Sequence, residues 1–146
     1  MRITVSATTD APPERVWAAL ADIASHVDWM LDAESITFVG ERRRGAGTTF
    51  DCLTRIGPLS LRDRMVVTQW DEGRAIAVRH EGAVVGEGVF ELRPYGVGTE
   101  ITWTETLSFR LRLGGPAAAV VARPILTSIW RGNLRRLGHA AALTRL

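Results

Sequence analysis

Residues 85–109, VGEGVFELRPYGVGTEITWTETLSF, contain two stretches of alternating apolar and polar side chains joined by a turn, and they decide the fold. After the turn at 95–98, Ile101 and Trp103 show the alternation clearly. A period of two is typical of a strand with one buried face, and closely spaced glycines are typical of a tight turn. The stretch therefore predicts a β-hairpin with one apolar face.

The same alternation extends upstream of this hairpin. Strands are expected near residues 2–8, 35–41, 48–56, 59–70, 74–80, 85–93 and 99–109. Turn residues separate the last six, and the connections are too short for the crossovers that parallel neighbours need. The sequence therefore predicts a seven-stranded antiparallel sheet.

Helical patterns flank the strands at both ends of the chain. A helix is expected to begin at Ala11-Pro12-Pro13, because proline is tolerated in a first turn, and a second short helix is expected to end near Met30. A long helix is expected from Gly114-Gly115 to the end of the chain, with a kink or a looser segment at Pro124. Its expected apolar face comprises Ala118, Ala122, Ile125, Leu126, Ile129, Trp130, Leu137 and Ala140. The predicted class is α+β.

Length and composition favour one globular domain over residues 1–146, since the hydrophobic fraction is 46% and the charged fraction 23%. No apolar stretch approaches the roughly 20 residues that a membrane helix needs, so we expect a cytoplasmic protein without stable membrane insertion. The 18 basic residues are all arginine and are interleaved with 16 acidic residues. Such a distribution lacks a one-sided basic patch, and we therefore expect no nucleic-acid binding.

Several chemistries lack their required residues. The absence of lysine excludes Schiff-base catalysis and a phosphate-binding lysine. His26, His80 and His139 lack ligand spacing typical of zinc, so no metal is expected. The glycine pairs within 86–88 and 96–98 lack the strand-to-helix context of dinucleotide binding, and no cofactor is expected.

Four polar residues share a face with large apolar ones and should point into the protein. They are Asp63, His80 and Glu105 on three strands and Asn133 on the long helix. If the first three converge, His80 could act as a general acid or base that either carboxylate orients. The alternatives are structural: a hydrogen-bonded histidine at a strand end, carboxylates paired with arginine, and an asparagine packed against backbone carbonyls.

The order strand, two short helices, six strands and long helix resembles the helix-grip superfamily, which includes START-related lipid carriers, birch-pollen-allergen-like proteins and polyketide cyclases. The segments that carry this resemblance are 11–17 (APPERVW), 27–30 (VDWM), 47–50 (GTTF) and 90–103 (FELRPYGVGTEITW). The chain is most similar to a polyketide cyclase/dehydrase-like member. The resemblance implies a curved sheet that wraps the long helix and encloses a cavity.

The expected wall of that cavity combines strand and helix residues. The alternation of inward and outward side chains along the strands places Phe50, Met65, Phe90 and Trp103 in this wall. The long helix contributes Ile125, Ile129 and Asn133. The resemblance places Trp29 and Met30 at the mouth. We expect the cavity to bind a small lipophilic molecule, polyketide-like or aromatic, and acid/base groups in it would suit cyclisation or dehydration.

Two alternatives to catalysis stay open. One is a carrier or sequestering protein for a lipid, quinone or hydrophobic metabolite, and the other is a partner-binding regulator that resembles chaperone activators of this fold. A homodimer is possible and nothing in the sequence requires it. Fold alone does not separate these functions.

Overall fold

The computed structural model describes residues 1–110 and 113–143, and it confirms the predicted order of strands and helices. The elements are β1 (Arg2–Thr9), α1 (Pro13–Ala21), η1 (Ile23–Ser25), α2 (His26–Trp29), β2 (Ala33–Val39), β3 (Thr49–Ile56), β4 (Leu59–Asp71), β5 (Ala75–Glu81), β6 (Val84–Tyr95), β7 (Gly98–Phe109) and α3 (Gly115–Leu143). The predicted long helix extended to the end of the chain, and residues 144–146 lie outside the described residues.

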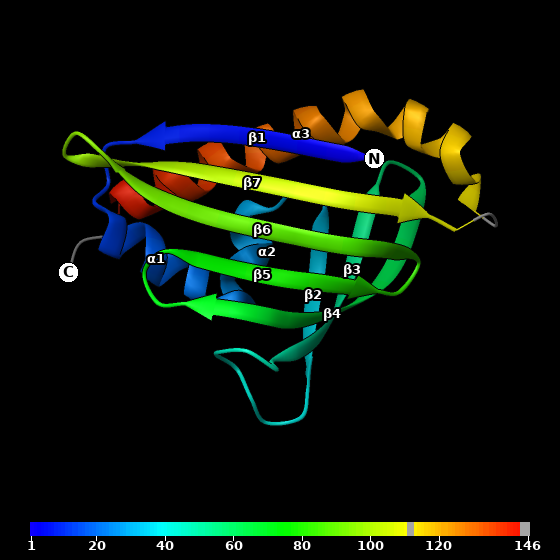
Figure 1. The fold of residues 1–146 in the computed structure, drawn as a ribbon, viewed down its shortest axis with the longest axis horizontal. Coiled ribbons are helices and arrows are strands. Elements are labelled where there is room, and N and C mark those ends of the chain that lie inside the picture. The colour runs from blue at the N-terminus through cyan, green and yellow to red at the C-terminus, as the bar shows by residue number, and fades with distance from the viewer. Residues whose placement is uncertain (111–112, 144–146) are drawn as a thin grey trace.

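All seven strands form one antiparallel sheet in the order β1-β7-β6-β5-β4-β3-β2. The chain order is broken only at β1, which pairs with the last strand. In Figure 1, β2 and β3 lie behind β4–β6 and run steeply across them, so the sheet curls toward its own inner face. This confirms the predicted curved antiparallel sheet.

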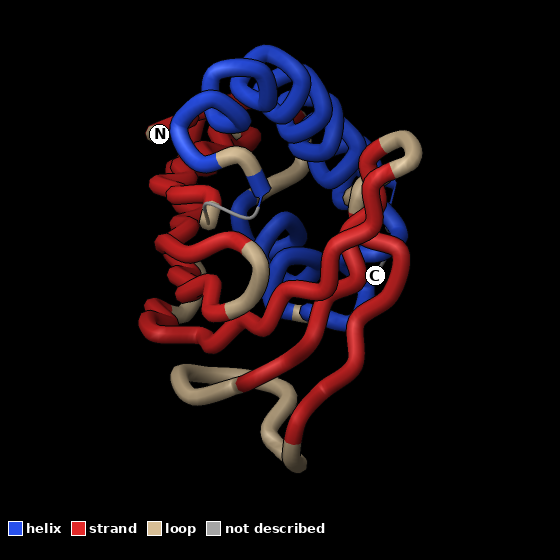
Figure 2. Tube along the Cα trace, turned by 90° about the vertical axis from the view of Figure 1, so that its right-hand side faces the viewer, coloured by secondary structure: helices blue, strands red, loops and turns tan. Residues whose placement is uncertain are grey.

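The helices cover the inner face of one half of the sheet. α3 packs mainly against β1 and further against β7, α1 and α2. Figure 2 shows the helices gathered on one side, with the strands wrapping around them. The strands β2–β4 have no contact of that extent with α3. Of these three strands, only β2 has a contact of that extent with a helix among the described residues, and that helix is α2.

The buried face of α3 differs from the predicted face. It comprises Gly115, Leu126, Trp130, Asn133, Leu134, Leu137, Gly138 and Ala141. Leu134 is fully buried, whereas Ile125 is 47% exposed and Ala140 is exposed. The prediction was wrong for Ile125 and Ala140, because the face of α3 that packing buries includes Leu134 and is rotated away from these two residues. The helix continues through Pro124 without a break.

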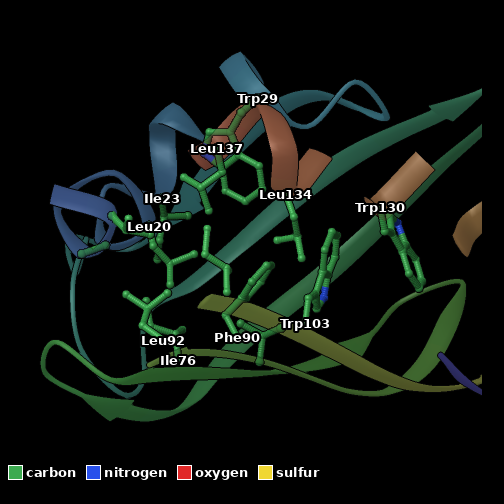
Figure 3. Close-up of a cluster of buried hydrophobic side chains, with 14 of the residues drawn as sticks. Leu20, Ile23, Trp29, Ile76, Phe90, Leu92, Trp103, Trp130, Leu134 and Leu137 are labelled. Atoms are coloured by element: carbon green, nitrogen blue, oxygen red, sulfur yellow. The ribbon is translucent and has the colours of Figure 1, made fainter. Parts of the chain in front are cut away.

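Aromatic side chains fill the core between the sheet and α3. Phe90 of β6 stacks on Trp103 of β7 with ring centroids 4.6 Å apart, and Trp103 lies 5.0 Å from Trp130 of α3. Trp29 of α2 meets Phe90 edge-on at 6.1 Å. Figure 3 shows these four rings together with Leu134 and Leu137. We call Trp29, Phe90, Trp103 and Trp130 the aromatic row.

Candidate functional site

Three of the four predicted inward polar residues meet in one buried cluster. His80 of β5 lies between Asp63 of β4 and Glu105 of β7: its Nδ1 is 2.5 Å from Asp63 Oδ2, and its Nε2 is 2.9 Å from Glu105 Oε2. The three residues are only 3–8% exposed. We call them the Asp63–His80–Glu105 triad.

A glycine in β6, the strand between β5 and β7, leaves space for the triad. Gly88 of β6 is the pairing partner of Glu105, and a Cβ atom at Gly88 would lie 2.3 Å from Glu105 Oε1. The carboxylate thus occupies the space where a side chain would project. A side chain at this position would displace Glu105 or push the strand.

A second glycine supports the opposite carboxylate. The Gly82 N–H donates to Asp63 Oδ1 over 3.2 Å, and a Cβ atom at Gly82 would lie 2.7 Å from the same oxygen. The sequence pattern places Gly82 between two expected strands and Gly88 within one. A glycine inside a strand often marks the close approach of another group, and that signal could have identified Gly88.

Every oxygen of the two carboxylates has a hydrogen-bond donor. Trp103 Nε1 donates to Glu105 Oε1 over 2.9 Å, so the indole that was predicted only as an apolar wall also binds the triad. Through this bond the triad is connected to the aromatic row. Buried carboxylates require such partners, because an unpaired buried charge is costly.

The electrostatics of His80 favour the charged imidazolium. Burial lowers its pKa, but the hydrogen bonds and negative charges of Asp63 and Glu105 outweigh burial and raise the pKa to about 10. Near pH 7 the imidazole is therefore already protonated and cannot serve as a base. Any group of the triad that accepts a proton at neutral pH must be a carboxylate.

The predicted wall residues are found at different depths. Phe50, Phe90 and Trp103 are buried, Met30, Met65 and Ile129 are half-buried, and Ile125 is exposed. Around Met65, the inner face of β2–β4 carries further half-buried apolar side chains. We call Ile36, Phe38, Ile56, Leu61 and Met65 the apolar inner surface.

Trp29 lies deeper than the resemblance implied. It is 3% exposed and packs against His26 and Phe90, so it is part of the core and not of a mouth. Met30 is half-buried, and the neighbouring Leu31 is 72% exposed. The chain therefore reaches the surface just after α2.

Asn133 belongs to a separate hydrogen-bond network that contains no member of the triad. Its Nδ2 donates to Asp32 Oδ1 over 2.7 Å, and its Oδ1 accepts from the Leu31 N–H and from Arg136. Asp32 Oδ2 also accepts from Trp130 Nε1 over 3.2 Å. We call this the Asp32 network. Sequence reasoning missed Asp32 and Arg136, which lie in a loop and on a helix flank without local signals.

Two hollows are lined by described residues. One of ≈ 380 Å³ lies between the start of α3 and the adjacent ends of β1 and β7, and includes Phe109 and Val120. The other, of ≈ 910 Å³, lies along β5–β7 and includes Arg79, Glu87 and Thr104. Neither hollow is lined by a residue of the predicted cavity wall, and the predicted cavity stays a prediction.

Two further observations concern metals and membranes. Within residues 1–110 and 113–143, no group of three His, Cys, Asp or Glu side chains could hold a metal ion. In the triad, the two imidazole nitrogens point to different carboxylates.

Across the same residues, no helix is both long and apolar enough to cross a bilayer.

Known proteins share this fold at low sequence identity. A crystal structure from Thermus thermophilus has 20% identity and a TM-score of 0.84, with 97% of each chain covered. The Zhui aromatase/cyclase from Streptomyces has 18% identity and a TM-score of 0.76, covering 97% of this chain and 93% of that chain. Ara h 8.0201 has 12% identity and a TM-score of 0.69, with 99% of each chain covered.

Sequence comparison gives the family. A search of curated proteins found no match. The model of one family, described as "Polyketide cyclase / dehydrase and lipid transport", matches residues 1–142. This match spans β1 to the last turn of α3 and agrees with the helix-grip architecture. The chain therefore belongs to the polyketide cyclase / dehydrase and lipid transport family.

Proposed function

We propose that this protein binds a small apolar molecule that contains a ring, held between the apolar inner surface of β2–β4 and α3. The observation that carries the proposal is the partial burial of Ile36, Ile56, Leu61 and Met65, which face inward yet are only partly covered. Contiguous apolar side chains that keep contact with solvent are typical of a binding site.

The aromatic row favours a ring-shaped ligand. Trp103 and Phe90 are already stacked, and Trp130 continues the row toward α3. Aromatic faces stack well on other rings, in addition to the area that such contacts bury. Membership of a family that includes cyclases and lipid transport proteins supports the same class of ligand.

Binding can be tested with a simple probe. Titration of the protein with 2-isopropylnaphthalene should quench tryptophan fluorescence with saturation, because the probe stacks near the aromatic row. Leu61→Asn should weaken the affinity about tenfold or more, since it places an amide in the apolar inner surface. Leu143→Asn, at a 66% exposed position near the end of α3, is the matched control and should bind like the unmodified protein.

The proposal would be overturned if 2-isopropylnaphthalene did not bind at all, or if Leu61→Asn and Leu143→Asn bound it equally. Native mass spectrometry of freshly purified protein provides an independent check. A co-purified apolar mass that is lost in Leu61→Asn would support binding at the same surface.

A second candidate function is acid/base catalysis on the bound molecule, and the bond between Trp103 and Glu105 favours it. A ligand along the aromatic row would lie near a buried carboxylate, and a carboxylate oxygen keeps a further lone pair after one hydrogen bond. Glu105 could then take a proton from a carbon next to a ketone. The C–H electron pair would move to the ketone oxygen as an enolate, and Asp63 and His80 would hold Glu105 in place.

This step is measurable as hydrogen–deuterium exchange of 2-tetralone in D₂O. The protein should accelerate exchange next to the carbonyl, and Glu105→Gln should lower the acceleration at least 100-fold. Glu100→Gln, on the same strand but paired with Arg93, is the control and should leave exchange unchanged. Equal exchange by Glu105→Gln and the unmodified protein would contradict catalysis and leave ligand binding intact.

A further inference from the structure

One buried hydrogen-bond donor in the core has no acceptor within residues 1–110 and 113–143. The Nε1–H of Trp29 is fully covered, and no described residue accepts a hydrogen bond from it. Trp29 as a whole is 3% exposed. Nearly all buried polar groups in proteins have a partner, so an unpaired indole N–H calls for an explanation.

Trp29 stands at one end of the aromatic row. Its ring meets Phe90 at 6.1 Å, and Phe90 in turn stacks on Trp103. A molecule that binds along the row thus approaches Trp29 at one end, and it passes the middle of the row, where Trp103 contacts Glu105.

The imidazole that contacts the Trp29 ring is uncharged. His26 lies 4.9 Å from Trp29 by ring centroids, and its Nε2 donates to the Leu20 carbonyl over 2.7 Å. Burial lowers the pKa of His26 to about 4, with the Leu20 bond and the charge of Asp22 opposing this only in part. A neutral imidazole offers no counter-charge to an anion. Arg136 is bound to the Trp29 carbonyl and to Asn133.

We propose that Trp29 Nε1–H donates a hydrogen bond to an uncharged oxygen of the ligand, so that the natural ligand is a ring compound with a carbonyl or hydroxyl group and not a plain hydrocarbon. This inference rests on the proposed function. It adds the ligand's chemical class and assigns Trp29 a specificity role. An ordered water on the indole is the competing explanation.

Two probes of similar shape separate these possibilities. 2-Acetylnaphthalene carries a ketone oxygen where 2-isopropylnaphthalene carries a methyl group. Trp29→Phe keeps an aromatic ring and removes the donor. It should lower the affinity for the ketone relative to the hydrocarbon about tenfold, the loss expected for one buried hydrogen bond. Trp70→Phe is the control, because Trp70 Nε1 donates to Glu72, and it should leave this ratio unchanged.

Nuclear magnetic resonance of the indole N–H groups gives a second readout in the unmodified protein. The chain has five tryptophans, and the Trp29 resonance is the one missing from Trp29→Phe. The ketone should shift it downfield, and the hydrocarbon should not.

The inference is overturned if both probes bind the unmodified protein, the affinity ratio is the same in Trp29→Phe, and the Trp29 resonance responds alike to both. That result would assign the indole to an ordered water and leave the proposed function standing. Failure of both probes to bind would overturn the proposed function and this inference with it.

Discussion

The imidazole of His80 has both nitrogens bonded to carboxylates, and this arrangement limits what the residue can do. The pKa of about 10 keeps it protonated near neutral pH, so it is a donor to Asp63 and Glu105 and not a free base. The sequence suggested an acid or a base without separating them. The second carboxylate excludes the role of a base, because it binds the imidazole nitrogen that a single carboxylate would leave free.

Gly88 is expected to be as necessary for the triad as its charged members. Gly88→Ala places a methyl group 2.3–2.7 Å from the Glu105 carboxylate, and we expect it to lower the free energy of unfolding by about 1–3 kcal/mol. Urea denaturation measures this.

The control is a double-mutant cycle with Glu105→Ala. Once the carboxylate is absent, Gly88→Ala should cost much less, because the space is then free. An equal cost in both backgrounds would show that the loss arises from the strand and not from the Glu105 carboxylate.

Among the described residues, hydrogen bonds near Asp32 and Trp29 and at Thr9 hold α3 to the rest of the chain. The Asp32 network binds it to the loop after α2, and Thr9 Oγ1 donates to the Gly138 carbonyl over 2.8 Å near the end of β1. Both contacts lie in the half of α3 that follows Pro124. The preceding half has the exposed Val120 and Val121. We therefore expect the first half of α3 to be displaced more easily than the second half when a ligand binds.

Asp32 should contribute to stability through α3. Asp32→Ala removes the acceptor of Trp130 Nε1 and Asn133 Nδ2, and we expect the free energy of unfolding to fall by about 1–3 kcal/mol. Chemical denaturation should show this. Asp28→Ala, at an exposed position of α2, should change stability by less than about 0.5 kcal/mol. Equal effects of the two substitutions would contradict a role for the Asp32 network.

For the whole molecule, two buried histidines respond to pH in opposite directions. The folded protein lowers the pKa of His26 from 6.5 to about 4. The contribution of His26 to the free energy of unfolding is therefore full above pH 6.5, and it is lost as the pH falls toward 4. His80 has a pKa raised to about 10, so its contribution is present below pH 6.5 and is lost as the pH rises toward 10. Together they place the stability maximum near pH 6.5.

This pH dependence is measurable residue by residue. Between pH 6.5 and 10 the free energy of unfolding should fall by an amount on the order of a few kcal/mol, and His80→Gln should remove most of that slope. His26→Gln should flatten the fall between pH 6.5 and 4. His139→Gln, at an exposed position, should keep both slopes. A stability that keeps rising from pH 6.5 to 10 would contradict the charged state of His80.

The fold could be predicted from the sequence because the patterns of apolar and turn residues that specify strands and helices are local. The alternation over 85–109 predicted β6 and β7 and the face that each buries, and the same pattern gave the remaining strands. Strand parity also predicted that Asp63, His80 and Glu105 point inward. The buried face of α3 was predicted wrongly in part, since a residue such as Leu134 is buried only through its contact with another element.

The tertiary structure decided what the inward groups do. Asp63, His80 and Glu105 lie on strands brought together by cross-strand register, so their distances and the glycines that make room for them depend on pairing across the sheet. Asn133 and Asp32 are 101 positions apart and meet only because α3 lies across the inner face. The sequence by itself determined which faces are buried, through the period of its apolar residues. Only the folded chain decided which buried polar groups share hydrogen bonds, because those bonds join residues that are distant in the sequence.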